Sequence, residues 1–214
     1  EKQKRFITDA SHEIKTPLAI LNLNLQLKNE EFGEDKYSKK MEAAIKTLKN
    51  SYEDMTFLHT KSKIKYKIEK FNLEEFLKDR VKYFELIAIT QNRELKLEVA
   101  NNVFVNISKI ELERLVDNNI SNAIKYSSVA STIKIILEDC VLKFISNGEK
   151  IKDTNIIFKR YVRENISLGG HGIGLSIVKD ICDKYKIKID VTSQENHNIF
   201  SYRLNCHTNI TSKG

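Results

Sequence analysis

The hydrophobic periodicity of the chain changes once, near residues 62–68, and this change limits what the chain can fold into. Before it, apolar side chains recur at intervals of three and four residues, which is typical of amphipathic helices. A polar segment at residues 30–37 contains Gly33 and predicts a turn between two helices. The first apolar stripe consists of Ile7, Ala10, Ile14, Leu18, Leu21 and Leu25, and the second of Met41, Ile45, Leu48, Tyr52 and Met55.

Two amphipathic helices joined by a short loop form an antiparallel hairpin. Such a hairpin cannot bury both apolar stripes completely, because each helix has only one neighbour. We therefore predict that two copies of the chain pair into a homodimeric four-helix bundle.

Residues 63–69, Lys-Ile-Lys-Tyr-Lys-Ile-Glu, alternate with a period of two and predict a strand. This shift of period predicts two domains, a helical hairpin at residues 1–66 and a second domain at residues 67–214. In the second domain Asn72 and Ser108 are predicted N-caps, and Glu111 completes a capping box with Ser108.

The second domain mixes helices with short strands, which predicts an α+β fold in which the helices gather on one mixed sheet. The whole chain is then a two-helix hairpin followed by an α/β sandwich. The polar tail from His207 is predicted to be frayed. The predicted helices cover residues 73–88, 109–125, 154–162 and 173–185, and the predicted strands cover residues 95–99, 103–105, 132–137, 141–145, 187–192 and 199–204.

The composition excludes several classes of protein. The 214 residues are 41% apolar and 30% charged, so a packed core is possible and extensive disorder is excluded. No stretch approaches the roughly 20 apolar residues of a membrane span, and no signal peptide opens the chain. Because the first residue is Glu1 rather than Met, we expect a fragment of a longer protein, whose other part can hold a membrane segment.

The cysteines and the charges say less about function. Cys140, Cys182 and Cys206 are far apart and odd in number, which predicts neither a metal site nor a disulfide framework and favours a reducing cytosol. The net charge of +7 favours anionic partners, although the lysines are scattered along the chain. A basic nucleic-acid-binding protein is one reading, because residues 61–70 hold five lysines. The chain has no aromatic stacking platform and no recognition motif, so we predict no nucleic-acid partner.

The first chemical candidate is His12, in the sequence Ser-His-Glu-Ile-Lys-Thr-Pro of residues 11–17. On a helix, His12 and Thr16 lie one turn apart on the same face, and Glu13 is adjacent. A neutral imidazole is a nucleophile near pH 7, and a neighbouring carboxylate can accept its proton. The alternative is a surface histidine, with Thr16 and Pro17 as the ordinary start of a helix.

The second candidate is the polar face formed by Asn118, Asn122 and Lys125, which follow one another at spacings of four and three. Asparagine is not favoured inside helices, so this face suggests a role beyond helix building. Amide oxygens can ligate Mg²⁺, and a lysine can meet phosphates as a point charge. The alternative is a solvated polar face.

The third candidate is the sequence Gly-Gly-His-Gly-Ile-Gly at residues 169–174, which holds four of the seven glycines. Glycines let the backbone approach a phosphate, and the following helix offers free N–H groups. The pattern matches neither the dinucleotide fingerprint nor the phosphate loop of nucleoside triphosphatases. The alternative is a flexible loop leading into a helix.

In this order and spacing, the motifs resemble those of the cytoplasmic catalytic core of a bacterial sensor histidine kinase of two-component systems. The resemblance covers almost the whole chain. Residues 6–18 look like the H box of the phosphoacceptor domain, residues 118–126 like the N box, and residues 157–163 like the F box. Residues 170–174 look like the second glycine box of the ATP-binding fold shared with gyrase, Hsp90 and MutL.

The resemblance implies an enzyme that phosphorylates His12 with ATP and Mg²⁺ and passes the phosphoryl group to an Asp of a response regulator. It implies that Glu13 is the base and that Thr16 orients water for dephosphorylation of the regulator. Asn122 would ligate Mg²⁺. The implied nucleotide-binding residues are Asn118, Asn122, Lys125, Tyr126, Asn147, Gly148, Arg163, Gly170, Gly172, Gly174 and Leu175.

The implied partners are a response regulator receiver domain and a second copy of the chain. The full-length protein would be anchored in the membrane, with this part at the cytoplasmic face of the bacterial inner membrane.

One box departs from the family pattern. The Asp of the family's Asp-x-Gly-x-Gly motif, which accepts a hydrogen bond from adenine, is replaced by Ser146 or Asn147, and its second glycine is replaced by Lys150. A neutral oxygen accepts without charge assistance, which predicts weaker adenine binding. The alternative function is therefore a degenerate kinase that acts mainly as a phosphatase or docking module. Asn119 stands where the family has an apolar residue, which predicts a buried amide that needs a partner.

Overall fold

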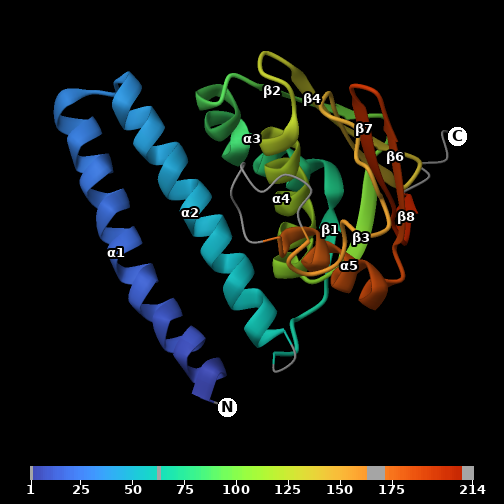
Figure 1. The fold of residues 1–214 in the computed structure, drawn as a ribbon, viewed down its shortest axis with the longest axis horizontal. Coiled ribbons are helices and arrows are strands. Elements are labelled where there is room, and N and C mark those ends of the chain that lie inside the picture. Colours follow the sequence, from blue (N-terminus) through green and yellow to red (C-terminus); the bar gives the residue numbers. More distant parts are fainter. Residues whose placement is uncertain (1, 62–63, 163–171, 209–214) are drawn as a thin grey trace, which may run out of the picture. The chain divides into compact units, whose positions relative to one another are not determined.

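The computed structural model describes residues 2–61, 64–162 and 172–208, and the side chains of residues 13–61, 64–162 and 172–206 within them. The chain forms two compact units, Glu1–Lys65 and Tyr66–Gly214. The first unit is a hairpin of two helices and the second is an α+β unit, as the periodicity predicts (Figure 1).

The hairpin consists of α1 (Lys2–Phe32) and α2 (Lys36–Thr60). Its buried apolar side chains are spaced seven residues apart, with Leu18 and Leu25 on α1 and Ala43 and Phe57 flanking the buried Asn50 on α2. This spacing is that of a narrow helix–helix seam. Several residues of the predicted stripes therefore stay exposed in the single chain, at about half of their surface: Leu21, Met41 and Leu48. The four-helix bundle remains a prediction.

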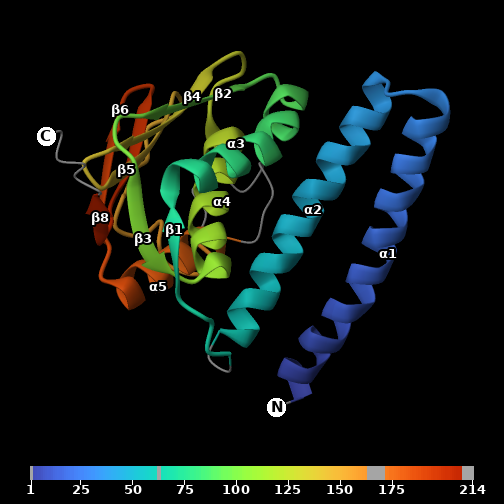
Figure 2. The same ribbon diagram turned by 180° about the vertical axis from the view of Figure 1, so that it is seen from behind.

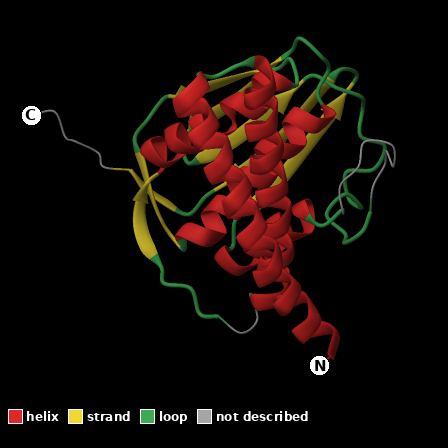
Figure 3. Ribbon diagram, turned by 90° about the vertical axis from the view of Figure 1, so that its left-hand side faces the viewer, coloured by secondary structure: helices red, strands yellow, loops and turns green. Residues whose placement is uncertain are grey.

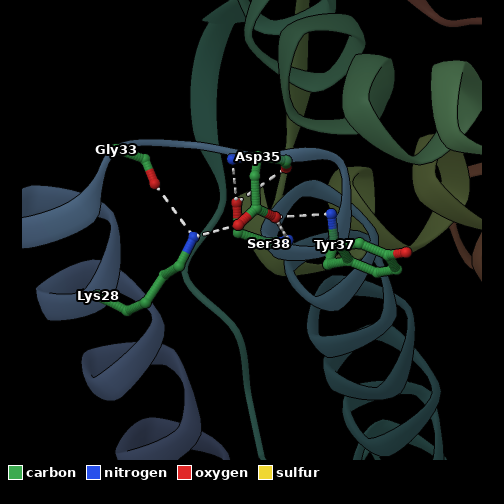
Figure 4. A network of polar contacts seen from close by, with 5 residues as sticks. All are labelled: Lys28, Gly33, Asp35, Tyr37 and Ser38. Carbon is green, nitrogen blue, oxygen red and sulfur yellow. Dashed lines mark hydrogen bonds and ion pairs between the residues drawn. The ribbon is translucent and has the colours of Figure 1, made fainter.

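The turn of the hairpin is held by a network of polar contacts around Asp35 (Figure 4). Gly33 has a positive φ of 76°, and Asp35 caps α2 by accepting from the backbone N–H groups of Tyr37 and Ser38, each at 2.7 Å. The Ser38 hydroxyl accepts from the Asp35 N–H at 2.9 Å, which completes a capping box. Lys28 Nζ bonds both the Asp35 carboxylate and the Gly33 carbonyl oxygen, so the end of α1 is tied to the start of α2.

The second unit contains three helices, all in the described residues: α3 (Leu73–Thr90), α4 (Lys109–Tyr126) and α5 (Gly174–Tyr185). Asn72 caps α3 and Ser108 caps α4, as predicted. The strands are β1 (Glu69–Asn72), β2 (Glu94–Val99), β3 (Val103–Ile107), β4 (Thr132–Glu138), β5 (Val141–Ser146), β6 (Lys188–Gln194), β7 (His197–Arg203) and β8 (Cys206–Thr208).

These strands form two sheets rather than the single mixed sheet that the sequence predicts. Five strands pair in the order β2-β4-β5-β7-β6, with β2 parallel to β4 and the other pairs antiparallel. Three form a smaller antiparallel sheet in the order β1-β3-β8. The helices α3, α4 and α5 cover one face of the larger sheet, as Figures 1 and 2 show. In the view of Figure 3, several strands of this unit lie behind its helices and others lie to the left of them.

The core of the second unit lies between α4 and the larger sheet. Alternate residues of β4 and β5 point into it, because a strand turns successive side chains to opposite faces. The core side chains with at most 2% of their surface exposed include Leu112, Leu115, Ile120, Ile124, Ile133, Ile135, Leu137, Leu142, Phe144 and Tyr202. This packing fixes α4 against the sheet, so residues on its remaining faces are held in place.

Four local predictions are wrong. Residues 64–68 are not a strand, and pairing with β3 begins only at Glu69. Residues 154–161 form turns instead of a helix. The tail is not frayed from His207 onward, because His207 and Thr208 belong to β8 and pair with β3. Cys140 and Cys206 are joined in a disulfide although no disulfide is predicted, because the antiparallel pairing of β5 with β7 returns the chain to the β4–β5 turn.

Candidate functional site

The predicted nucleotide-binding residues of the second unit gather on and around α4. Asn118 is only 6% exposed, Asn122 and Lys125 are half-buried, and Tyr126 at the end of the helix is 38% exposed. The exposure of these side chains therefore increases along α4 from Asn118 to Tyr126. Lys125 Nζ lies 4.7 Å from the centre of the Tyr126 ring, which holds the cation beside an aromatic face.

The N-terminus of α4 is fixed by a polar cluster that links it to α5. The Ser108 hydroxyl accepts from the Glu111 N–H, but the Glu111 side chain does not return to Ser108, so the predicted capping box is only half formed. The Tyr185 hydroxyl takes that place by accepting from the Ser108 N–H at 3.1 Å and donating to Glu111 at 2.6 Å. Lys184 Nζ donates to both Glu111 oxygens, at 2.7 and 2.8 Å.

Asn118 is in close contact with Gly174, the first residue of α5. A Cβ atom added to Gly174 would meet Asn118 Oδ1 at 2.1 Å, so α4 and α5 can approach this closely only without a side chain at residue 174. Asn118 Nδ2 donates to the Arg114 carbonyl oxygen at 2.9 Å. The structure therefore brings the second asparagine motif and the glycine-rich segment together, although 56 positions separate the two residues in the sequence.

The C-terminal end of α4 meets the altered glycine box. A Cβ atom on Gly148 would lie 2.4 Å from the Tyr126 carbonyl oxygen, and Gly148 forms a β-bridge with Ser127. The Ser128 N–H donates to the Asn147 carbonyl oxygen at 2.6 Å. Three predicted residues, Tyr126, Asn147 and Gly148, are thus in one place.

Arg93 also contacts this junction, and no pattern in the sequence predicts that contact. Its Nη2 atom donates to the Ser127 carbonyl oxygen at 2.6 Å and its Nε atom to the Ser127 hydroxyl at 3.3 Å. A shallow cavity of about 260 Å³ lies next to Arg93, and none of its lining residues is a predicted nucleotide ligand: Ile89, Asn92, Arg93, Glu94, Ala130, Ser131 and Thr132.

The altered box places its two candidate acceptors differently. Ser146 is the last residue of β5, is 8% exposed and pairs with Asn198 of β7. Asn147 is exposed, with its Oδ1 atom 3.4 Å from Nδ1 of His197. Lys150, in the position of the second glycine, is exposed.

The glycine-rich segment is described only in part. Gly172 has a positive φ of 65°, and its carbonyl oxygen accepts from the Tyr161 N–H at 2.7 Å. Gly174 begins α5 and Leu175 is half-buried in its first turn. Arg163 and Gly170 lie outside the described residues.

A buried ion pair lies immediately before Asn118. Arg80 of α3 holds the Asp117 carboxylate through two hydrogen bonds of 2.7 and 2.6 Å, and Arg114 lies 3.5 Å from the same carboxylate. Burial raises the pKa of Asp117 to about 6, while the two arginines act in the opposite direction. The two arginines therefore favour the charged form of this carboxyl group against the effect of its burial.

The sequence carried an overlooked signal for this pair. The buried residues of α3 include Phe76, Leu77, Phe84 and Ile87, and Arg80 falls in the same register on that face. A charged residue within an apolar stripe requires a buried partner. Asn119 does have the partner that the sequence predicts, since the Tyr202 hydroxyl donates to its Oδ1 atom at 2.7 Å.

The phosphoacceptor candidates lie on α1. His12 is inside this helix, but its side chain lies outside the described residues. Glu13 and Thr16 are exposed. The helix continues through Pro17, so the alternative that Thr16 and Pro17 start a helix is wrong.

A magnesium ion fits this residue set only together with phosphates. Within the described ranges, no group of three or more His, Cys, Asp or Glu side chains is placed to hold a metal. Mg²⁺ prefers oxygen ligands and keeps several waters when it binds with phosphates, and the amide oxygen of Asn122 is of the ligand type that it accepts. Among the helices of the described residues, none is both long enough and apolar enough to cross a membrane.

Two family models match the chain. The His Kinase A (phospho-acceptor) domain matches residues 2–61, and the histidine kinase-, DNA gyrase B- and HSP90-like ATPase matches residues 107–207. The sensor histidine kinase HprS of Escherichia coli is 28% identical over 217 residues, covering 95% of this chain and 48% of HprS. The sensor protein DltS of Streptococcus agalactiae is 25% identical over 201 residues, covering 88% of this chain and 50% of DltS.

The solved structures agree with the fold. The full-length ShkA structure superimposes with a TM-score of 0.63 at 18% identity, covering 95% of this chain and 46% of ShkA. The chain belongs to the histidine kinases, in which a phosphoacceptor hairpin precedes an ATPase domain. Within that family it is the catalytic core of a two-component sensor histidine kinase. The chain spans about half the length of the curated relatives it matches.

Proposed function

We propose that the chain phosphorylates His12 with ATP and passes the phosphoryl group to an aspartate of a response regulator. The observation that carries this proposal is the meeting of two glycine segments on α4, where Asn118 contacts Gly174 and Tyr126 contacts Gly148. ShkA, which shares the fold, is described in complex with AMPPNP, an analogue of ATP. This likeness supports a nucleotide beside α4.

In the proposed reaction each residue has one task. Asn122 ligates Mg²⁺, Lys125 contacts a phosphate, and the backbone around Gly172 and Gly174 approaches the phosphate chain. Mg²⁺ supplies charge neutralisation when bound, and positioning accounts for most of the remaining catalysis in phosphoryl transfer. The terminal phosphoryl group leaves ADP and bonds to the His12 imidazole, while Glu13 accepts the proton of the other ring nitrogen.

The second and third steps take place on α1. The carboxylate of the regulator's aspartate takes the phosphoryl group from His12, and the proton returns from Glu13 to the ring, which restores the neutral imidazole. In the opposite activity, dephosphorylation of the regulator, Thr16 orients a water that hydrolyses the aspartyl phosphate to inorganic phosphate. The exposure of Glu13 and Thr16 supports a docking surface for a receiver domain on this face of α1.

The assembly and location of the protein are part of the same proposal. Two copies pair through their hairpins, which would cover the exposed Leu21, Met41 and Leu48. The longer protein is anchored in the bacterial inner membrane with this part on the cytoplasmic face, as expected for a core that spans half of sensor proteins such as HprS.

A second candidate function is supported by the altered glycine box. Ser146 and Asn147 are both uncharged, and Lys150 carries a side chain where the family has a glycine. Weak nucleotide binding would leave a protein that acts mainly as a phosphatase of the regulator, through Glu13 and Thr16.

Labelling with γ-labelled ATP and Mg²⁺ tests the proposal. The chain is expected to acquire a label that is labile in acid and stable in alkali, as a phosphohistidine is. His12→Gln removes the label, whereas His59→Gln, in the same hairpin, keeps it. A folded chain that stays unlabelled contradicts kinase activity, and release of phosphate from a phosphorylated regulator would then establish the second candidate.

A further inference from the structure

The fold joins two cysteines that are 66 residues apart in the sequence. Cys140 lies in the turn between β4 and β5, and Cys206 is the first residue of β8. Their Cα atoms are 5.9 Å apart, which is within the range of natural disulfides. The Leu204 N–H donates to the Cys140 carbonyl oxygen at 2.8 Å, so backbone contacts alone hold the two segments side by side.

The turn itself does not favour a cysteine. Asp139 and Cys140 have positive φ angles of 47° and 64°, which is the conformation of a two-residue hairpin turn that prefers glycine in the second position. A side chain in this conformation is disfavoured, whereas glycine adopts it freely. The conformation of the turn therefore does not explain a cysteine at residue 140, whereas a disulfide with Cys206 does.

The strand that Cys206 begins is marginal by itself. β8 has three residues and is an edge strand of the smaller sheet, paired with β3. So short a ladder contributes little stability. A covalent bond between Cys206 and the β4–β5 turn can therefore decide whether β8 stays paired.

β8 is connected in two ways to α4, the helix that carries the proposed nucleotide ligands. β3, the partner of β8, runs through Ile107 directly into Ser108, the N-cap of α4. Asn205, next to Cys206, donates to the Tyr185 carbonyl oxygen at 2.8 Å, and the Tyr185 hydroxyl accepts from the Ser108 N–H. The start of the helix that carries Asn118 is thus linked to β8 through β3 and through these two hydrogen bonds.

We propose that Cys140 and Cys206 form a reversible thiol–disulfide pair, which small-molecule disulfides oxidise, and that the bridge fastens β8 to the domain. One cysteine thiolate attacks the small disulfide, forms a mixed disulfide and releases one small thiol. The second cysteine thiolate then attacks the protein-bound sulfur and releases the other small thiol. Two protein thiols are oxidised and one small disulfide is reduced to two thiols.

The third cysteine provides a matched control. Cys182 is fully buried in α5, and burial raises the pKa of its thiol to about 12. Because the thiolate is the reactive form, Cys182 stays outside the exchange. Cys140 and Cys206 are only half-buried, so small thiols can reach them.

The experiment equilibrates the 214-residue chain in buffers of reduced and oxidised glutathione at graded ratios. Intact mass and thiol alkylation then report the bridged fraction without any variant. Oxidising buffers are expected to remove two alkylatable thiols and reducing buffers to restore them, in Cys182→Ala as in the unaltered chain. The bridge is expected to raise Tm by about 10 °C, from the length of the closed loop. It is also expected to slow hydrogen exchange of the β3 amides.

Each outcome is decisive. Thiols that stay free at every ratio, or a bridge to Cys182 or to glutathione alone, overturn the pairing. A bridge that reducing buffers cannot open overturns its reversibility. A bridge that leaves Tm and the exchange of β3 unchanged, compared with Cys140→Ser and Cys206→Ser in the same buffers, overturns the fastening of β8. All three readouts are independent of kinase activity, so their result stands whether or not His12 is labelled.

Discussion

Asn118 Oδ1 occupies the space that a side chain at residue 174 would need, with only 2.1 Å between this oxygen and a Cβ on Gly174. On its other side the Asn118 amide is tied to the Arg114 carbonyl oxygen by a hydrogen bond of 2.9 Å. The amide cannot swing away without losing that bond. Asn118 and Gly174 therefore behave as one unit that sets the spacing of α4 and α5.

Gly174→Ala is expected to lower Tm and to weaken nucleotide binding at least about tenfold, since the new methyl group must displace Asn118. The direction of the change in stability is informative, because replacing a helical glycine by alanine normally stabilises a protein by about 0.4–1 kcal/mol. Thermal unfolding and titration with a fluorescent nucleotide measure the two effects. In the double variant Gly174→Ala with Asn118→Ala, Tm should recover while binding should not. A single variant as stable as the unaltered chain would refute the overlap.

Gly148→Ala is expected to destabilise the chain by about 2–3 kcal/mol, because its Cβ would lie 2.4 Å from the Tyr126 carbonyl oxygen and backbone cannot be trimmed to make room. Urea unfolding measures the change. Lys150→Ala, two residues later at an exposed position, is the control and should stay within about 0.5 kcal/mol. Equal effects of the two substitutions would contradict the close approach.

Asp117→Ala is expected to cost about 3–5 kcal/mol, because it removes the carboxylate that the half-buried Arg80 and the buried Arg114 share. Chemical denaturation measures this loss. Asp183→Ala breaks an exposed pair with Lys179 and should cost only about 0.3–0.5 kcal/mol. A loss at Asp117 as small as that at Asp183 would show that the buried pair contributes no stability.

The α1–α2 turn should loosen in acid. The hydrogen bond from Lys28 and the N–H of Ser38 lower the pKa of Asp35 to about 2, below its ordinary value of 3.8. A carboxyl whose pKa is lower in the folded chain stabilises it above the unfolded pKa, and this contribution disappears as the pH falls from about 4 to 2.

Hydrogen exchange of the Tyr37 and Ser38 amides should therefore accelerate in that range. Asp35→Asn should make exchange fast already at neutral pH and remove the acid step. Glu34→Gln, which touches the exposed Lys39, should retain the step. An acid step that survives in Asp35→Asn would assign it to another group.

Ser146→Asp is expected to raise the affinity for ATP about tenfold, because a carboxylate accepts a stronger hydrogen bond than a hydroxyl does. Asn147→Asp is the matched variant, since the sequence left both positions open. Isothermal titration with ATP measures both. If neither variant binds more tightly, the lost charge at this box does not limit nucleotide binding.

Local patterns predicted most of the fold. Asn72 and Ser108 cap helices because their side chains reach the next N–H groups, which depends on a few neighbouring residues only. Two of the failures are local, at residues 64–68 and 154–162, and the others involve partners far along the chain. β8 exists because β3 offers it an edge, and the Glu111 side chain leaves its capping box because Tyr185 and Lys184 arrive from α5.

The candidate site was predictable for the same reason and to the same extent. The face of Asn118, Asn122 and Lys125 follows from helical spacing. The contact of Asn118 with Gly174, the brace of Arg93 on Ser127 and the pairing of Cys140 with Cys206 depend on how distant segments pack. The sequence does indicate that Arg80, by its place in an apolar stripe, and Asn119 each need a buried partner, but not which residue that partner is.

The pairing of β3 with both β1 and β8 has a consequence for the order of folding during synthesis. The α1–α2 hairpin is closed by neighbouring residues and can form soon after Thr60 has left the ribosome, since local contacts form fastest. Val105 pairs with Cys206, which is synthesised much later. The ATPase domain therefore cannot complete its smaller sheet until nearly all of its residues have emerged. A nascent chain would thus carry a formed α1–α2 hairpin before its ATPase domain is complete.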